Sequence, residues 1–282
     1  MKNIKLLLLL FASILIANYS KSQSHSADTL INIGSHSLHF NIKYGNGIPI
    51  LFESGGGNDG SVWSHLVDSL HAKLGTTIIT YDRAGYGRSE LNNKLDDKSK
   101  GYILNAVKDL ELALKTLGLN KELIFVAHSF GGFNAALFAQ RNPQLVKGIV
   151  LIDANLKCFF DANIRKKFKE MLTDSVLLNF KSTSLGLYYL MLAYDESVEL
   201  IQQTTFPPEI PIIDLVAGNP PNPFNDLHDS ERWVQCHKEF GTAYPNRVYY
   251  IAKNCGHYIF IDNPKFVIDH IIEMNNKVTN KK

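Results

Sequence analysis

The sequence predicts an α/β protein with a largely parallel sheet that is covered by helices on both faces. Three observations support this: apolar runs are short and continuous, segments of helical periodicity alternate with them, and the chain of 282 residues is 45% hydrophobic. An alternating segment at 31–43 favours a hairpin before the parallel strands. The expected parallel strands are 48–52, 76–81, 123–127, 146–152, 210–216 and 247–252.

Helical periodicity follows most of these strands, at 61–74, 102–117, 130–140, 230–240 and 264–274. Ser61 is expected to cap the first helix. The alternation stops at 157–206, where only helical patterns occur. We expect a helical lid there, inserted after the sixth strand and lying at the carboxyl edge of the sheet, where open α/β sheets bind ligands. The predicted organisation is one domain over 28–282 that includes this lid.

Residues 1–23 have the pattern of a secretory signal peptide. Lys2 and Lys5 precede an unbroken apolar run at 6–17, and small and polar residues follow it. This run is shorter than the roughly 20 residues that a membrane-spanning helix needs. We therefore expect cleavage, a periplasmic or secreted protein, and no stable membrane insertion afterwards. An uncleaved anchor is the alternative.

Charge and cysteine content narrow the class of function. The formal net charge is only +2, so no basic surface for nucleic acid is indicated. Cys158, Cys236 and Cys255 lack the spacing of a metal site, and no metal is expected. We expect these cysteines to be packed thiols, with a Cys236–Cys255 disulfide as the alternative in an oxidising compartment.

The strongest chemical signal lies between a predicted strand and a predicted helix and reads Ala127-His128-Ser129-Phe130-Gly131. A serine on such a sharp strand-to-helix turn has its hydroxyl lifted above the edge of the sheet. Small residues must flank it because the strand and the helix nearly touch. A near-match at 182–186 has no apolar strand before it, so the context selects Ser129.

Together with other segments in fixed order, this turn resembles the α/β-hydrolase superfamily, and the resemblance covers about residues 48–272. The other segments are Ser54-Gly55-Gly56, Asp82-Arg83-Ala84-Gly85-Tyr86-Gly87-Arg88-Ser89, Asp153 at a strand end, and Gly256-His257 before the last helix. Two positions depart from the family pattern, which has Gly at Ala127 and His at Ser54. The extra methyl group should be tolerated, whereas Ser54 lacks a side chain that often braces the oxyanion loop.

The resemblance implies a serine hydrolase with a helical lid and no cofactor. Ser129 would be the nucleophile, His257 the base that takes its proton, and Asp153 the acid that orients the imidazole. The backbone N–H groups of Gly56 and Phe130 would form the oxyanion hole. His128 is expected to pack at the turn and to take no part in catalysis.

The acid is the least determined member of this triad. Most family members place it after the penultimate strand, where residues 218–222 contain no carboxylate. Some relatives, the haloalkane dehalogenases among them, place it one strand earlier, at the position of Asp153. Asp226, which follows the later strand, is the alternative.

A serine at the turn excludes the carboxylate nucleophile of dehalogenases and epoxide hydrolases of this fold. We expect a small-molecule substrate with an ester-type bond (a carboxylic ester, thioester or lactone), cleaved through an acyl-enzyme. Amide hydrolysis and acyl transfer stay open as alternatives. Aromatic residues of the lid either line an apolar acyl pocket or pack the lid itself: Phe159, Phe160, Tyr188, Tyr189 and Phe206.

Two other classes of function stay open. One is a non-catalytic ligand-binding protein of the same fold. The other is an NAD-binding Rossmann oxidoreductase, because residues 55–60 satisfy G-x-G-x-x-G after a strand, and Asp82 follows about 20 residues later.

Overall fold

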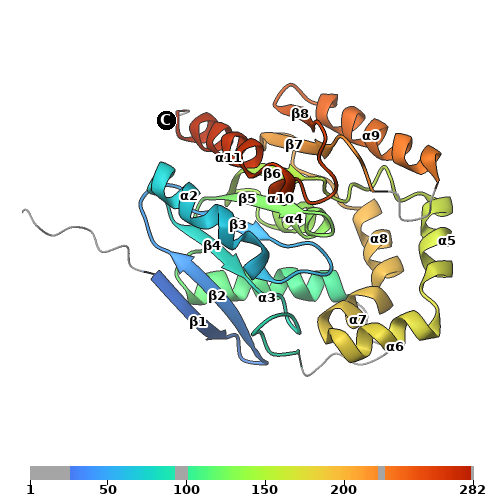
Figure 1. Ribbon diagram of the computed structural model, residues 1–282. Coiled ribbons are helices and arrows are strands. Elements are labelled where there is room, and N and C mark those ends of the chain that lie inside the picture. The colour runs from blue at the N-terminus through green and yellow to red at the C-terminus, as the bar shows by residue number, and fades with distance from the viewer. Residues whose placement is uncertain (1–25, 93–100, 222–225, 281–282) are drawn as a thin grey trace, which may run out of the picture.

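The computed structural model describes residues 26–92, 101–221 and 226–280, so the predicted signal peptide lies outside the described residues. An eight-stranded sheet forms the centre of the molecule in the order β1-β2-β4-β3-β5-β6-β7-β8 (Figure 1). The strands in chain order are β1 (Ser26–Asn32), β2 (Ser37–Lys43), β3 (Ile50–Glu53), β4 (Ile78–Tyr81), β5 (Leu123–His128), β6 (Val146–Ile152), β7 (Ile212–Ala217) and β8 (Arg247–Ala252).

The strand pairing confirms the predicted mixture of a hairpin and a parallel sheet. β1 and β2 form an antiparallel hairpin, and β2 also runs antiparallel to β4. The remaining neighbours, from β4 to β8, pair in parallel. Almost every residue of β3 to β7 is buried, because helices cover both faces of these strands.

Each face of the sheet has its own hydrophobic core. α2 (Ser64–Leu74), α10 (Ile259–Asp262) and α11 (Pro264–Thr279) pack on one face. α3 (Tyr102–Thr116), α4 (Gly131–Arg141) and α9 (Leu227–Thr242) pack on the other. This double covering is the architecture that the alternating strands and helices predict.

The order of the parallel strands locates the expected ligand site. Chain order reverses between β3 and β5, since β4 lies on one side of β3 and β5 on the other. Ligands of open α/β sheets bind beyond the carboxyl ends of the strands at such a switch point. The parallel strands do not follow the 3-2-1-4-5-6 order of a dinucleotide-binding Rossmann sheet, so the oxidoreductase alternative is wrong.

The first helical segment begins earlier than predicted. A 3-10 turn, η1 (Gly60–Trp63), precedes α2, and its N-cap is Asp59 instead of Ser61. The Asp59 carboxylate accepts a hydrogen bond from the Ser61 N–H at 2.9 Å. The Ser61 hydroxyl also donates to the Asp59 carboxylate. A carboxylate accepts two hydrogen bonds more readily than a serine hydroxyl does, which favours Asp59 as the cap.

Four helices lie between β6 and β7 and form the predicted lid: α5 (Ala162–Met171), α6 (Asp174–Thr183), α7 (Leu185–Leu192) and α8 (Tyr194–Gln202). Figure 1 shows them grouped beyond one edge of the sheet. The sequence pattern indicated helices over 159–172 and 185–194, which correspond to α5 and α7, and did not indicate α6 or α8. α6 has no buried residue and therefore little apolar periodicity. Among the described residues, no helix combines the length and hydropathy of a membrane span.

A disulfide between Cys158 and Cys236 connects the base of the lid to α9, with a Cα–Cα distance of 5.7 Å. The expectation of packed thiols is therefore wrong for these two residues, and so is the alternative pairing with Cys255. Cys255 is a buried free thiol. The bonded residues are 78 positions apart, and α9, which packs on β7 and β8, brings Cys236 to the segment that follows β6.

Candidate active site

Ser129 occupies the turn between β5 and α4 in a strained backbone conformation. Its φ is 53°, in the left-handed region that L-residues other than glycine rarely adopt. A Cβ atom added to Gly131 would lie 2.8 Å from the Glu53 carbonyl oxygen, so the turn leaves no space for a side chain there. Ala127, where the family has glycine, is fully buried within β5. The strained turn holds the serine side chain at the carboxyl edge of the sheet.

The structure brings Ser129, His257 and Asp153 into one chain of contacts. The Ser129 Oγ lies 2.9 Å from Nε2 of His257. The Nδ1 of the same imidazole lies 2.7 Å from Oδ2 of Asp153. Asp153 directly follows β6 and has a φ of 41°, while His257 lies in the loop between β8 and α10. Both ring nitrogens of His257 thus face partners in the order that a serine triad requires.

The buried carboxylate of Asp153 is held on both oxygens. Its Oδ1 accepts hydrogen bonds from Trp233 Nε1 at 2.9 Å and from the Ala217 N–H at 3.0 Å. Burial alone would raise the pKa of Asp153. The hydrogen bond and charge of His257, the charge of His237 and the hydrogen bond from the Ala217 N–H together lower this pKa below its ordinary value. Asp153 therefore stays ionised near neutral pH. Trp233 has no local sequence signal, because α9 positions it from 80 residues away.

Asp226, the alternative acid, lies at the start of α9. Its carboxylate caps that helix by accepting a hydrogen bond from the His228 N–H at 3.0 Å. It also accepts one from Lys167 Nζ of the lid at 2.8 Å, and its side chain is 42% exposed. The carboxylate that contacts His257 is that of Asp153.

His128 is buried beside the triad. Its Nε2 lies 3.0 Å from the backbone carbonyl oxygen of His257, to which it donates, and the two ring centroids are 4.6 Å apart. Burial and the neighbouring imidazole lower the pKa of His128 to about 3, so the ring is neutral near neutral pH. The residue packs at the turn, as expected, and it also anchors the backbone of His257.

The N–H groups of Gly56 and Phe130 are the donors that the sequence analysis expects to form an oxyanion hole. Both residues line the same cavity as Ser129. Within the described part of the chain, neither N–H donates a hydrogen bond. Phe130 is the N-cap of α4, so its N–H belongs to the group of donors that a helix start leaves unpaired.

A buried arginine holds the loop that contains Gly56. Arg83 Nη2 donates to the Gly55 carbonyl oxygen, and Nη1 donates to Glu53 Oε1 and to the Ser54 carbonyl oxygen, both at 2.6 Å. In a trans peptide unit the C=O and the following N–H point in opposite directions. Fixing the Gly55 carbonyl therefore also fixes the direction of the Gly56 N–H.

Tyr86 holds the next peptide unit, since its hydroxyl donates to the Gly56 carbonyl oxygen at 2.5 Å. Arg83 and Tyr86 belong to the segment that also contains Asp82, so one turn positions the whole oxyanion loop. The sequence pattern showed that Ser54 cannot brace this loop as the usual histidine does. It did not show that Arg83 and Tyr86 hold the loop, because these side chains come from about 30 residues farther along the chain.

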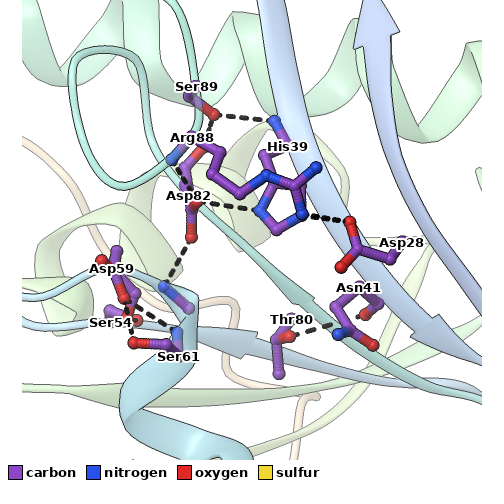
Figure 2. A network of polar contacts seen from close by, with 11 residues as sticks. Asp28, His39, Asn41, Ser54, Asp59, Ser61, Thr80, Asp82, Arg88 and Ser89 are labelled. Atoms are coloured by element: carbon purple, nitrogen blue, oxygen red, sulfur yellow. Dashed lines mark hydrogen bonds and ion pairs between the residues drawn. The ribbon is translucent and has the colours of Figure 1, made fainter.

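The far end of the loop is fixed by a polar network (Figure 2). Ser54 Oγ donates to the Asp59 carbonyl oxygen at 2.8 Å and accepts from Trp63 Nε1 at 2.9 Å. Asp82, at the centre of the network, accepts from the Gly60 N–H at 2.8 Å. Figure 2 shows Asp82 between this loop and the hairpin residue His39, whose Nδ1 lies 2.9 Å from Asp82 Oδ2.

A cavity of about 290 Å³ opens above Ser129. Phe159 and Phe160 line it, which agrees with the pocket interpretation for these two residues. Tyr188 and Tyr189 contact one another at 5.2 Å between ring centroids and do not line it, and Phe206 lines another cavity. The apolar lining residues that the sequence analysis did not find are Phe168, Leu190, Met191, Tyr194 and Trp233.

Comparison with known proteins agrees with this geometry. The model of a family described as alpha/beta hydrolase fold matches residues 48–191. The chain belongs to this family. Among curated proteins, the uncharacterized protein YqjL of Bacillus subtilis is 26% identical to this chain over 227 residues. The match covers 80% of this chain and 82% of that protein.

Other similarities are shorter or lie in structure alone. A cis-3-alkyl-4-alkyloxetan-2-one decarboxylase of Shewanella oneidensis is 30% identical over 135 residues, 45% of this chain but only 40% of that protein. A carboxylesterase structure from Nitrososphaera gargenis has a TM-score of 0.65 at 16% identity, with 90% of this chain and 100% of that chain covered. A thermophilic esterase from Thermogutta terrifontis has a TM-score of 0.62 at 18% identity, with 91% and 99% covered. These structures share the α/β-hydrolase fold.

Proposed function

We propose that the protein is an exported serine hydrolase that cleaves an ester-type bond in a small molecule with an apolar acyl group. The observation that carries the proposal is the pair of contacts from Ser129 Oγ to His257 Nε2 and from His257 Nδ1 to Asp153 Oδ2. Family membership and structural neighbours that are esterases support it.

In the proposed reaction, Ser129 Oγ attacks the carbonyl carbon of the substrate while His257 Nε2 takes the hydroxyl proton. Asp153 stabilises the imidazolium that forms. The negative charge on the carbonyl oxygen is met by the N–H groups of Gly56 and Phe130. The intermediate then expels the alcohol, thiol or other leaving group, which receives the proton from His257, and an acyl-enzyme remains. Water repeats the same steps and releases the carboxylic acid.

The lining of the cavity supports an uncharged, apolar acyl group. Six aromatic or aliphatic side chains of the lid and Trp233 of α9 line the cavity beside the triad and the oxyanion loop. Among the described residues that line it, there is no lysine or arginine to bind an acidic substrate. A carboxylic ester, thioester or lactone with an apolar acyl part fits these walls, and the volume favours short to medium chains.

A fluorophosphonate probe tests the proposal, because it reacts only with a serine that a neighbouring base activates. We expect one probe per molecule, mapped to Ser129 by mass spectrometry of peptides. We also expect hydrolysis of p-nitrophenyl esters, with kcat/KM passing through a maximum as the acyl chain lengthens. An unlabelled, folded protein without esterase activity would support the non-catalytic ligand-binding alternative instead.

The hydroxyl of Tyr86 provides a test of the oxyanion loop. Tyr86→Phe should lower kcat about tenfold and leave KM nearly unchanged. The hydroxyl holds the Gly56 carbonyl, and once that peptide unit can turn, the neighbouring Gly56 N–H is less firmly directed, which weakens binding of the transition state more than binding of the substrate. Tyr250→Phe is the matched control, because it removes a hydroxyl that bonds Glu273, remote from the loop. Equal effects of the two substitutions, or a change in KM alone, would contradict the role of Tyr86.

Export is proposed from the apolar N-terminal run and gains support from the Cys158–Cys236 disulfide, since such bonds form in oxidising compartments. In the native host, the protein should be recovered from the periplasmic or extracellular fraction. N-terminal sequencing should then give a first residue between Ser22 and Asp28. Membrane-bound protein that begins at Met1 would show an anchor instead.

A further inference from the structure

A second cavity, of about 230 Å³, lies between α4, the end of α8 and the end of α9. Its wall is mostly apolar, with contributions from Phe133, Ala136, Leu156, Ile201, Phe206 and Phe240. Asn155 lines both this cavity and the catalytic one, so the two are neighbours. Nothing in the proposed hydrolysis uses the second cavity.

Two cationic side chains also line the second cavity, Lys157 and Arg247, and no acidic side chain of the described residues lines it. Lys157 Nζ donates to backbone carbonyl oxygens, that of Thr204 at 2.8 Å and that of Gln202 at 3.4 Å. Within the described parts of the chain, neither cation forms an ion pair. The cavity therefore combines apolar walls with positive charge that no carboxylate at its surface balances.

The guanidinium group of Arg247 is held in place, but not all of its N–H groups donate hydrogen bonds. It lies 4.5 Å from the ring centroid of Phe240 and 4.3 Å from that of Tyr244. Its Nη2 donates a long hydrogen bond, 3.4 Å, to the Phe206 carbonyl oxygen, and its Nε is buried without a partner among the described residues. Aromatic rings thus fix the plane of a group that has donors to spare.

One buried carboxylate lies within electrostatic range of Arg247. Burial lowers the pKa of Arg247 below its ordinary value, and Tyr244 and Asp214 act in the opposite direction without reversing this shift. The Oδ2 of Asp214 lies 2.8 Å from Nδ1 of His237, with which it forms a buried pair. Asp214 does not line the cavity. It steadies the charge of Arg247 without occupying the donors of the guanidinium.

We propose that the second cavity binds an amphiphilic carboxylate, a medium-chain fatty acid, at a site separate from the catalytic triad. The alkyl chain would pack against Phe133 and Leu156, and the carboxylate would accept hydrogen bonds from Arg247 and Lys157. An apolar cavity of about 150 Å³ holds the six carbons of benzene, so 230 Å³ has room for about nine non-hydrogen atoms. Octanoate matches this size, with its carboxylate at the opening.

A ligand in this cavity would contact Asn155, which is hydrogen-bonded to the catalytic turn. The Asn155 N–H donates to the Ser129 carbonyl oxygen at 2.8 Å. The site nevertheless rests on its own lining residues, so the inference stands whether or not Ser129 is a nucleophile.

Titration calorimetry with octanoate on the mature, disulfide-bonded protein near neutral pH tests the inference. We expect one octanoate per molecule at this site, at least tenfold weaker binding to Arg247→Gln, and a substantial recovery in Arg247→Lys. Lys238→Gln is the matched control, since Lys238 is an exposed cation of α9, a helix beside the cavity, and does not line the cavity itself. Its octanoate affinity should stay within threefold of the wild type. Octan-1-ol, which has the same chain without the charge, should bind at least tenfold more weakly.

Thermal unfolding of each variant separates a lost ligand from a lost fold. Three results would overturn the inference: no octanoate binding at millimolar concentration, equal affinity of wild type and Arg247→Gln, or equal affinity for octanoate and octan-1-ol. Octanoate bound only in the catalytic cavity would give the second result, because Arg247 does not line that cavity.

Discussion

Replacement of Ser129 by alanine is expected to lower kcat/KM on a good p-nitrophenyl ester by about 10⁶-fold, as loss of the nucleophile does in a serine triad. The substitution removes only the hydroxyl that His257 contacts at 2.9 Å. Fluorophosphonate labelling should disappear completely. The thermal transition should stay nearly unchanged, because no buried apolar group is lost. Initial rates with enough enzyme to detect about 10⁻⁶ of wild-type activity, together with calorimetric melting, measure both effects.

The chain provides a matched control for this substitution. Ser182 lies in the near-match to the catalytic motif at 182–186, but its hydroxyl is on exposed α6 and donates to the Asn179 carbonyl oxygen. Ser182→Ala should retain labelling and activity within about twofold. Activity of Ser129→Ala within about tenfold of wild type, equivalent to about 1.4 kcal/mol in activation free energy, would remove Ser129 from the mechanism.

Asp153→Asn is expected to lower kcat by about 10⁴-fold, and the contacts of the carboxylate explain why. Trp233 and Ala217 both donate to Oδ1, so the amide oxygen of the new side chain must stay there. The amide nitrogen then takes the place of Oδ2, at 2.7 Å from His257 Nδ1, and both groups cannot be donors. The imidazole is forced into the tautomer whose Nε2 carries a proton, which cannot accept the proton of Ser129.

Asp226→Asn is the matched comparison for the acid, since it makes the same chemical change at the alternative position. Its side chain is 42% exposed and contacts Lys167, so we expect kcat to change by less than threefold. Both variants should be assayed on one ester near neutral pH, with their folding checked by circular dichroism. A larger loss in Asp226→Asn than in Asp153→Asn would make Asp226 the acid and contradict the assignment.

Local patterns predicted the parts of the molecule that depend on a few neighbouring residues. β-Branched and aliphatic runs gave the strands, and the small residues around Ser129 gave the turn, because close packing of strand and helix acts within five positions. Asp153 was identified from the resemblance to relatives that place the acid one strand earlier, and its contact with His257 agrees with the meeting of parallel strand ends at one edge of the sheet. The strands and the turn needed only sequence order and local geometry, whereas the acid also needed the family pattern.

The features that the sequence did not predict depend on contacts between distant segments. Arg83 reaches the Gly55 carbonyl from the next strand end, and Trp233 reaches Asp153 from α9. Neither contact leaves a periodic pattern along the chain. The pairing of Cys158 with Cys236 is of the same kind, because spacing alone cannot rank the three possible pairings of three cysteines. The lid helix α6 was missed because an exposed helix has no apolar stripe.

The Cys158–Cys236 bond has a consequence for how the unfolded chain behaves. It closes a loop of 78 residues that contains all four lid helices, and closure of such a loop removes unfolded-state entropy worth about 4.5 kcal/mol at 25 °C in the chain-entropy relation. The packing of the lid is uneven, because α6 buries no residue whereas Ile164, Leu190 and Val198 of the other lid helices are fully buried in the core. In the same polypeptide kept reduced, packing alone would have to offset this entropy, and α6, which buries no residue, would be the part of the lid most easily lost.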